Sequence, residues 1–176
     1  EQCLDPAGWH VEGETGTYDI RHLEDSADDR EKNYARIFYK EIYLEDYDEQ
    51  RDITFNQTLI VTYSLKYRDY LRHRRDGQIQ RALNALNEDT SKLKKKNAHD
   101  YRRLISQKAT DKKGKNVKIT YELDQAAIDE EAKYDGFYAV ETNLDDDIST
   151  ILKANRGRWE IEESFRIMKD DFRSRP

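Results

Sequence analysis

Short apolar runs separate long charged stretches in this chain, and they predict a mixed order of strands and helices. Residues 58–63, TLIVTY, form a β-branched apolar run that is typical of a buried strand. Residues 35–44, ARIFYKEIYL, and 117–123, VKITYEL, are rich in aromatic and β-branched side chains and predict two more strands. A further strand of the buried type is predicted at 135–142, DGFYAVET. The acidic stretch 45–52 is expected to be a connector.

Helical patterns account for most of the remaining residues. Ser64 is placed to cap a helix that starts at Leu65, and Gly77 weakens its middle by up to about 1 kcal/mol relative to alanine. The apolar stripe of this helix is predicted to comprise Leu65, Tyr70 or Leu71, Ile79, Leu83 and Leu86. Further helices are predicted at 91–109, which is strongly basic, and at 124–134, 146–155 and about 158–173.

Turn and cap signals set the boundaries near the C-terminus. Three consecutive aspartates, 145–147, lie where the strand at 135–142 gives way to a helix. Carboxylates are favoured at a helix N-terminus by the helix dipole, so capping by Asp145 is the interpretation, rather than metal binding. A break is expected at Gly157. Asp135 and Gly136 are expected to form a turn.

Composition limits the classes of protein to consider. The chain has 176 residues, of which 39% are charged and 36% hydrophobic, with 12 Tyr, 5 Phe and 2 Trp. We expect one polar domain, or a domain with a sub-domain. Cys3 is the only cysteine, which excludes an internal disulfide and favours a reducing compartment. No apolar run approaches the roughly 20 residues of a membrane span, so no membrane partner is expected. The lack of a starting methionine suggests a piece of a longer protein.

Charge is segregated along the chain. Residues 64–118 carry 17 Lys or Arg and 6 Asp or Glu, whereas residues 1–63 and 119–176 are both acidic. A basic block between acidic flanks is one form of a polyanion-binding surface. The alternative is a solvated helical surface whose charges pair with the acidic flanks, and charge alone leaves both open.

The last predicted helix places charges beside large apolar side chains. At about 100° per residue, Arg158, Glu162 and Lys169 fall on one stripe, between a wall of Ile161, Phe165, Met168 and Phe172 and the ring of Trp159. Such a stripe can be an internal ladder in which Arg158 pairs with Glu162. It can also hold a divalent ion on the carboxylate, with the flanking cations on a phosphate backbone.

These residues resemble a known family. The spacing R-x3-E-x6-K, met by Arg158, Glu162 and Lys169, resembles the tyrosine–arginine–glutamate–lysine signature of bacterial insertion-sequence transposases with a DDE active site. The stretches RWEIEESFRIMK and YDGFYAVETNL are similar to that family, and TLIVTYSLKYRDYLRHRRDGQIQRA is similar to one branch of it. The signature's tyrosine position holds Asn155, which is a departure from the pattern.

The resemblance implies an α+β fold with part of a ribonuclease H-like core. Residues 1–130 would be a β-rich insertion that contains the basic block 64–118, and residues 131–176 the C-terminal strand–helix part of the core. Glu162 would be the third acidic residue of the catalytic triad and a ligand of Mg²⁺ (or Mn²⁺). The two aspartates that share the metal are expected outside this chain, so we expect that the chain alone does not cleave DNA.

Partners follow from the same resemblance. The implied substrate is double-stranded DNA at transposon ends and target sites, handled by a homodimer of the full-length protein in the bacterial cytoplasm, near the nucleoid. Arg158 and Lys169 would contact the DNA near the scissile phosphate. The other predicted contacts are Asn155 and Arg166 on the last two helices, and Lys66, Arg68 and Arg72 in the basic block.

Two other functions remain open at this point. The chain could be a non-catalytic DNA-binding or interaction remnant of a transposase, in which case Glu162 is dispensable. It could also be a structural polar α+β domain, which predicts no affinity for DNA.

Overall fold

Two compact units make up the protein. The computed structural model describes residues 4–88, 93, 100–111, 117–155 and 157–158. One unit comprises Glu1–Tyr63 and Tyr138–Pro176, and the other comprises Ser64–Phe137. Helices and strands occur in both, so the predicted α+β class is confirmed. The whole of the predicted basic block lies in the second unit.

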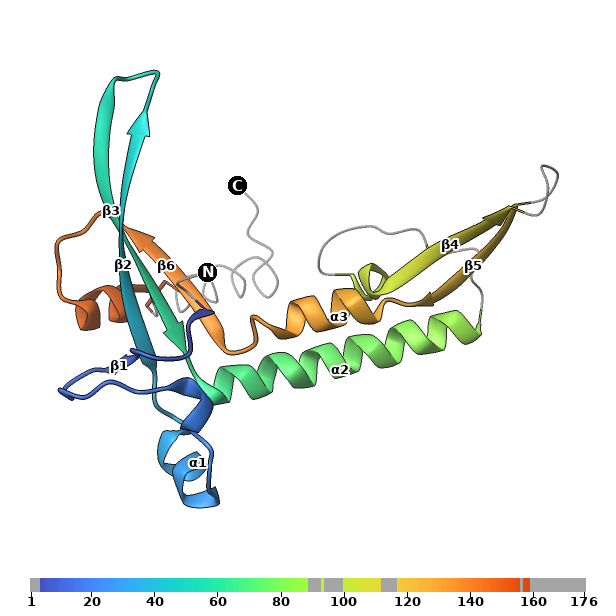
Figure 1. Ribbon diagram of the computed structural model, residues 1–176, viewed down its shortest axis with the longest axis horizontal. Coiled ribbons are helices and arrows are strands. Elements are labelled where there is room, and N and C mark those ends of the chain that lie inside the picture. Colours follow the sequence, from blue (N-terminus) through green and yellow to red (C-terminus); the bar gives the residue numbers. More distant parts are fainter. Residues whose placement is uncertain (1–3, 89–92, 94–99, 112–116, 156, 159–176) are drawn as a thin grey trace, which may run out of the picture. The chain divides into compact units, whose positions relative to one another are not determined.

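A four-stranded sheet in the order β1-β2-β3-β6 forms the centre of the first unit (Figure 1). Pairing is antiparallel between β1 and β2 and between β2 and β3. A helical segment at residues 148–155 follows the last strand, and residues 157–158 are also helical. The remaining bounds in this unit are β1 (His10–Val11), η2 (Ile20–His22), α1 (Ala27–Asn33), β2 (Phe38–Asp48), β3 (Ile53–Tyr63) and β6 (Phe137–Thr142).

Buried aromatic and branched side chains hold this unit together. Trp9, Phe38 and Ile60 are fully buried, and the ring of Trp9 lies 6.1 Å from that of Tyr63. The indole Nε1 of Trp9 donates to the carbonyl oxygen of Asp5 at 2.9 Å, which satisfies its polar atom. Burial of Trp9 was not predicted, because its neighbours Pro6 and Gly8 carry turn signals.

Strands β2 and β3 form one long hairpin. Their register runs from Phe38 opposite Tyr63 to Asp48 opposite Ile53. The predicted strands at 35–44 and 58–63 are confirmed, but the prediction of an acidic connector at 45–52 is wrong for its first half. Strand pairing continues there because the charged side chains point into solvent. A short turn closes the hairpin, in which Asp52 has a positive φ of 55° and Asp48 accepts from the amide of Gln50.

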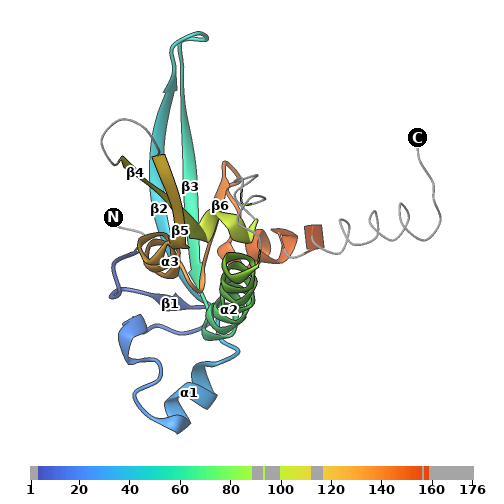
Figure 2. The ribbon, with the colours of Figure 1, turned by 90° about the vertical axis from the view of Figure 1, so that its right-hand side faces the viewer.

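The far end of the hairpin extends beyond its neighbouring strands. β1 pairs only with Phe38 and Tyr39, and β6 lies beside the opposite end of β3, where the hydroxyl of Thr62 donates to the carbonyl oxygen of Tyr138. Figures 1 and 2 show the hairpin continuing past both strands. Its tip is therefore a ribbon of two strands.

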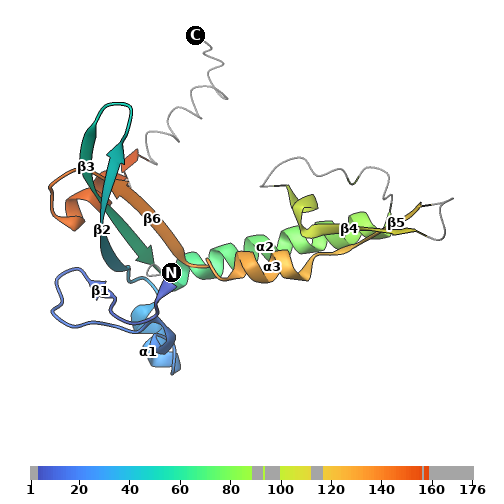
Figure 3. The same ribbon diagram turned by 45° about the horizontal axis from the view of Figure 1, so that its top comes forward.

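In the second unit, a long helix lies beside a short helix and a two-stranded sheet. Figures 1 and 3 show α3 alongside α2. Leu104 and Ala82 are fully buried, and the amide of Asp124 donates to the carbonyl oxygen of Leu104 at 2.8 Å. The elements are α2 (Leu65–Asn87), η4 (Tyr101–Leu104), β4 (Ile105–Asp111), β5 (Val117–Leu123) and α3 (Gln125–Ala132). The predicted strand at 117–123, the Ser64 cap and the helix within 124–134 are confirmed.

The predicted basic helix at 91–109 is wrong in its second half. Residues 101–104 form a single 3-10 turn, and β4 pairs with β5 from Ile105 opposite Leu123 to Asp111 opposite Val117. The lysines and arginines favour a helix locally, but a strand partner later in the chain decides the conformation. Residues 89–92 and 94–99 lie outside the described part.

The C-terminal predictions are partly corrected. β6 forms at 137–142, but it is an edge strand with half-exposed side chains rather than a buried one. The helix cap is Asp147, two residues after the predicted Asp145. Gly157 is helical, so the expected break is not found there. The predicted division at residue 130 falls inside α3.

Candidate nucleic-acid interface

The basic helix α2 separates its charges onto two faces. Ser64 caps it by accepting from the amide of Tyr67, and the helix then runs to Asn87. Its buried residues are Leu65, Arg68, Gln78 and Ala82, which recur every three, four or ten residues and so lie on one side. Two of these four side chains are polar. The apolar stripe predicted from the sequence therefore misses much of the face that is buried.

Arg75 binds a carboxylate on the inner face of α2. Its Nη1 donates to Oδ1 of Asp135 at 2.7 Å, and its Nη2 donates to Oδ2 of the same carboxylate. The two side chains are 12% and 5% exposed, so both are largely withdrawn from water. The hydrogen bonds to Asp135 raise the pKa of the Arg75 guanidinium. A two-point pair of this kind fixes the position of the turn that carries Asp135.

That turn is shaped by the next residue. Gly136 has a φ of 89°, a conformation that L side chains rarely adopt, and its carbonyl oxygen accepts from the amide of Ser64 at 3.0 Å. The turn predicted at Asp135 and Gly136 is thus confirmed. Its ionic partner was not predicted, because nothing local in the sequence connects Asp135 with Arg75.

A second buried network joins α2, η4 and α3. The guanidinium of Arg103 donates to both carboxylate oxygens of Glu131, at 2.6 and 2.7 Å. Its Nη2 also donates to Oε1 of Gln78 at 2.7 Å. These contacts place cations of the basic block against carboxylates of the acidic C-terminal third. The alternative of pairing with the acidic flanks is therefore correct for Arg75 and Arg103.

The opposite face of α2 is cationic and aromatic. At about 100° per residue, one exposed stripe follows the solvent side of the helix and contains no carboxylate. We call it the α2 stripe; its residues are Lys66, Tyr70, His73, Arg74, Gly77 and Arg81. Asp69 and Asp76 lie on one flank of it. This segregation matches the pattern expected of a surface that contacts a polyanion.

Contacts within the α2 stripe, and with Tyr67 beside it, orient its cations. The rings of Tyr67 and Tyr70 stack with centroids 6.1 Å apart, and the guanidinium of Arg74 lies 5.6 Å from the centroid of the Tyr70 ring. Arg81 folds back along the helix, and its Nε donates to the carbonyl oxygen of Gly77 at 3.2 Å. In the described residues neither Arg74 nor Arg81 forms an ion pair, so their charges face outward uncompensated.

The three DNA contacts predicted on α2 differ in their exposure and in their partners. Lys66 is exposed and lies on the stripe. Arg68 is buried, with its guanidinium 3.2 Å from the carboxylate of Asp69, so we leave it out of the proposed contacts. Arg72 is half-exposed and leans toward Asp135, with Nε 3.6 Å from Oδ2. Arg74 and Arg81 were included only as part of the basic block, and Tyr70 was assigned, as the alternative to Leu71, to the apolar stripe, although it is 53% exposed. Projection onto a helical wheel would have placed all three on one face.

The predicted catalytic residues lie mostly outside the described part of the chain. This holds for Glu162, Arg166 and Lys169. Asn155 ends the helical segment 148–155, where its Nδ2 lies 3.5 Å from the hydroxyl of Tyr138. Arg158 is exposed and helical. Within the described residues no group of three or more His, Cys, Asp or Glu side chains is arranged to hold a metal ion.

The aspartate cluster 145–147 provides a helix cap, as predicted, but through Asp147 rather than Asp145. Asp147 accepts hydrogen bonds from the hydroxyl of Ser149 at 2.6 Å, from the hydroxyl of Thr150 at 2.7 Å and from the amide of Thr150 at 3.0 Å. These bonds, that of Ser149 first, hold the pKa of Asp147 well below its usual range. The Asp147 carboxylate therefore caps the helical segment 148–155, which precedes Arg158 in the sequence.

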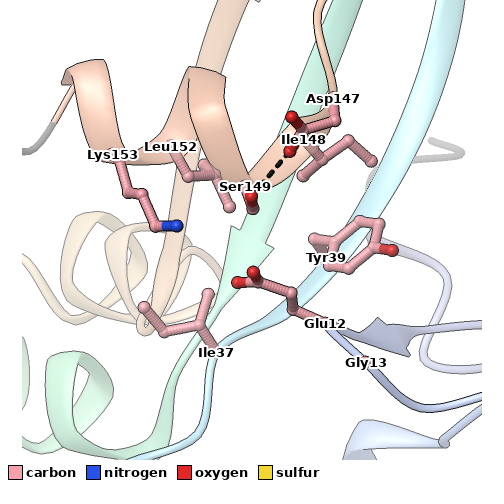
Figure 4. A pocket seen from close by; sticks show the side chains of 9 residues that line it. All are labelled: Glu12, Gly13, Ile37, Tyr39, Asp147, Ile148, Ser149, Leu152 and Lys153. Carbon is pink, nitrogen blue, oxygen red and sulfur yellow. Dashed lines mark hydrogen bonds between the residues drawn. The ribbon is translucent and has the colours of Figure 1, made fainter.

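A groove of about 290 Å³ lies beside this helix in the first unit (Figure 4). Glu12, Tyr39 and Lys153 contribute polar groups, and Ile37, Ile148 and Leu152 contribute apolar walls. Figure 4 shows the carboxylate of Glu12 pointing between Lys153 and Tyr39. Its charged groups are the carboxylates of Glu12 and Asp147 and the ammonium of Lys153, so the groove does not favour an anion.

Comparison with protein-family models, with curated proteins and with solved structures finds no match to this chain. Among the described residues, no helix combines the length and apolar character required to cross a membrane.

Proposed function

We propose that this chain is part of a DDE transposase, which cuts and joins DNA at the ends of an insertion sequence by metal-dependent phosphoryl transfer. The observation that carries the proposal is the R-x3-E-x6-K spacing of Arg158, Glu162 and Lys169, preceded by DGFYAV at 135–140. In this proposal the strand and helices after residue 130 belong to a ribonuclease H-like core, and the residues before it belong to the insertion.

The two faces of α2 support a role for the insertion in holding DNA. Three arginines of the basic block, Arg68, Arg75 and Arg103, bind carboxylates within the protein. The cations of the α2 stripe are left for an external anion. Because the inner contacts fix the helix, the stripe is a rigid row of charges, and contacts of this kind position a protein on the phosphate backbone without reading sequence.

Glu162 is the proposed catalytic residue. It would supply one carboxylate ligand to Mg²⁺ or Mn²⁺, together with two aspartates expected outside this chain, and a metal pair held this way stabilises the attacking and leaving oxygens of a phosphoryl transfer. Arg158 and Lys169 would bind the DNA strand beside that site, with Asn155 and Arg166 next to them. Of this constellation the described residues include Asn155 and Arg158 but not Glu162, so the geometry around the metal is part of the proposal.

Mobilisation by the full-length protein tests the catalytic role. Glu162→Gln keeps the size of the side chain and removes its charge, and we expect excision and joining to be lost. Glu163→Gln is the matched control, because Glu163 falls on the outward side of the predicted helix. Loss of activity in the first variant alone supports the proposal. Undiminished mobilisation by Glu162→Gln would favour the non-catalytic remnant.

Cleavage by the 176-residue chain alone is a separate test. We expect no Mg²⁺-dependent nicking of duplex DNA, because one carboxylate does not hold two ions. Robust nicking that disappears in Glu162→Gln would show that the chain contains a complete active site. Salt-dependent binding of duplex DNA without nicking is the expected behaviour.

A further inference from the structure

The tip of the β2–β3 hairpin exposes large apolar and aromatic side chains. Tyr43 is 78% exposed, Tyr47 53% and Ile53 51%, and Leu44 and Phe55 are more than one-third exposed. All five lie beyond the residues that pair with β1, and Tyr43 and Leu44 share a groove with Thr142, the last residue of β6. We call residues 41–56 the hairpin tip. Exposed apolar side chains gathered on one element mark an interaction surface more often than single ones do.

Register places these side chains on both faces of the ribbon. Directly opposed residues share a face, and Tyr43, opposite Thr58, and Tyr47, opposite Thr54, lie on one face. Leu44 opposite Gln57, and the pairs that contain Phe55 and Ile53, lie on the other. A ribbon that stabilised itself by packing one face would show the usual alternation of buried and polar positions. The tip shows large exposed side chains on both faces.

The same residues are strongly acidic. The hairpin tip contains six Asp or Glu and one Arg. The carboxylate of Glu41, and to a lesser extent that of Asp145, raises the pKa of the Tyr43 phenol, and the hydrogen bond to Asp52 raises that of Tyr47. A groove of about 670 Å³ lies beside Tyr43 and Leu44, and its other wall carries the exposed Leu144 and Asp145. The surface therefore combines apolar contacts with a negative field.

The combination of exposed apolar side chains and negative charge limits which kind of partner can bind the hairpin tip. Nucleic acid and anionic lipid are both repelled by the carboxylates. A second hairpin tip is also disfavoured, because each carries a net charge of −5. Carboxylates on open strand edges do protect against aggregation, but that role does not account for the exposed tyrosines and phenylalanine. The complementary surface is a cationic protein surface that also offers aromatic side chains.

The α2 stripe has that chemistry. It offers Lys66, Arg74 and Arg81 beside the stacked rings of Tyr67 and Tyr70, and it contains no carboxylate. We propose that the hairpin tip of one copy of this chain docks on the α2 stripe of a second copy, so that the chain self-associates through two different surfaces. Because the stripe is also the proposed DNA contact, duplex DNA displaces the hairpin tip. The docking itself does not depend on DNA being a ligand.

Light scattering after size-exclusion chromatography tests the association. We expect the chain to exceed its monomer mass at about 0.1 M salt and to return to it at about 1 M, where the screening length falls from about 10 Å to about 3 Å. Glu45→Lys with Glu49→Lys reduces the net charge of the tip from −5 to −1 and should raise the dissociation constant by more than about tenfold. Asp28→Lys with Glu31→Lys, on exposed positions of α1, is the matched control and should leave the constant unchanged.

Mixing two variants tests which surfaces meet. The tip variant keeps a native stripe, and Lys66→Glu with Arg74→Glu keeps a native tip. Each alone should be monomeric, and an equal mixture should associate again, because the native tip of one variant then faces the native stripe of the other. Circular dichroism of both variants confirms that they fold. A native chain that is monomeric at low salt overturns the proposal, and so does a mixture that stays monomeric. Retention of DNA binding by the tip variant separates this result from the proposed function.

Discussion

Arg75 on α2 and Asp135 in the turn before β6 form a buried two-point ion pair, although 60 residues separate them in the sequence. Arg72 also approaches this carboxylate, at 3.6 Å. A buried pair contributes little when compared with apolar residues of the same shape, but loss of one partner leaves the other charge without compensation. The pair therefore fixes how α2 meets the chain that returns from α3.

Removal of Asp135 should strongly destabilise the second unit. We expect Asp135→Ala to lower the free energy of unfolding by about 3 kcal/mol, because Arg75 remains buried and charged. Urea denaturation followed by circular dichroism measures this change. Asp146→Ala removes an exposed carboxylate and should change stability by less than about 0.5 kcal/mol. The double variant Arg75→Met, Asp135→Leu should recover much of the loss, and equal losses in single and double variants would contradict the assignment.

Substitutions on the two faces of α2 should have different consequences for DNA binding. Arg74→Ala and Arg81→Ala each remove an outward cation. We expect each to weaken binding of duplex DNA and to reduce the slope of log K against log salt by about 0.9. Fluorescence anisotropy at several salt concentrations gives both quantities, and the unfolding free energy should stay nearly constant.

Arg68→Ala provides the contrast on the inner face. It should lower the unfolding free energy and leave the salt slope unchanged, because Arg68 is buried beside Asp69. A reduced slope in Arg68→Ala with an unchanged slope in Arg74→Ala would show that the DNA contacts lie elsewhere.

The sequence predicted an element of this fold correctly where the interactions that determine it lie within a few residues. Ser64 as a cap, the apolar run before it and the strand at 117–123 all follow from side-chain shape and hydrogen bonding within a few residues. Residues 101–109 were predicted as helix, since the partner of β4, strand β5, comes later in the chain. The length of the β2–β3 hairpin was missed for the same reason.

The sequence predicted which segment forms the candidate interface, but not which of its arginines face outward. The sequence identifies a basic block, and a count of charges treats Arg68, Arg74 and Arg75 alike. The structure distinguishes them, because a carboxylate accepts from two of the three. Asp69 is the next residue after Arg68 on α2, whereas Asp135 comes from outside the helix, so only a tertiary contact reveals that it neutralises Arg75.

Gly77 should be replaceable at a gain in stability. A Cβ added there meets no atom within 4 Å, and Gly77 is not among the residues with positive φ. We expect Gly77→Ala to raise the free energy of unfolding by about 0.5 to 1 kcal/mol, because alanine loses less backbone freedom in a helix. Thermal and urea denaturation measure the gain. A loss of stability would mean that other protein groups pack against the α2 stripe at Gly77.

The cap of the helix 148–155 should depend on pH with a definite sign. Its hydrogen bonds lower the folded-state pKa of Asp147 below the value in the unfolded chain, which is about 3.9 for aspartate. The stabilisation is therefore present above about pH 4 and is lost as the pH falls toward the lower folded-state pKa. Carbon-13 NMR of the side-chain carboxyls should show Asp147 titrating well below the ordinary range of aspartate. Ser149→Ala with Thr150→Val should move the Asp147 midpoint upward, toward the ordinary value. An unmoved midpoint would show that these hydroxyls do not hold the carboxylate, and that the helix leading to Arg158 begins differently.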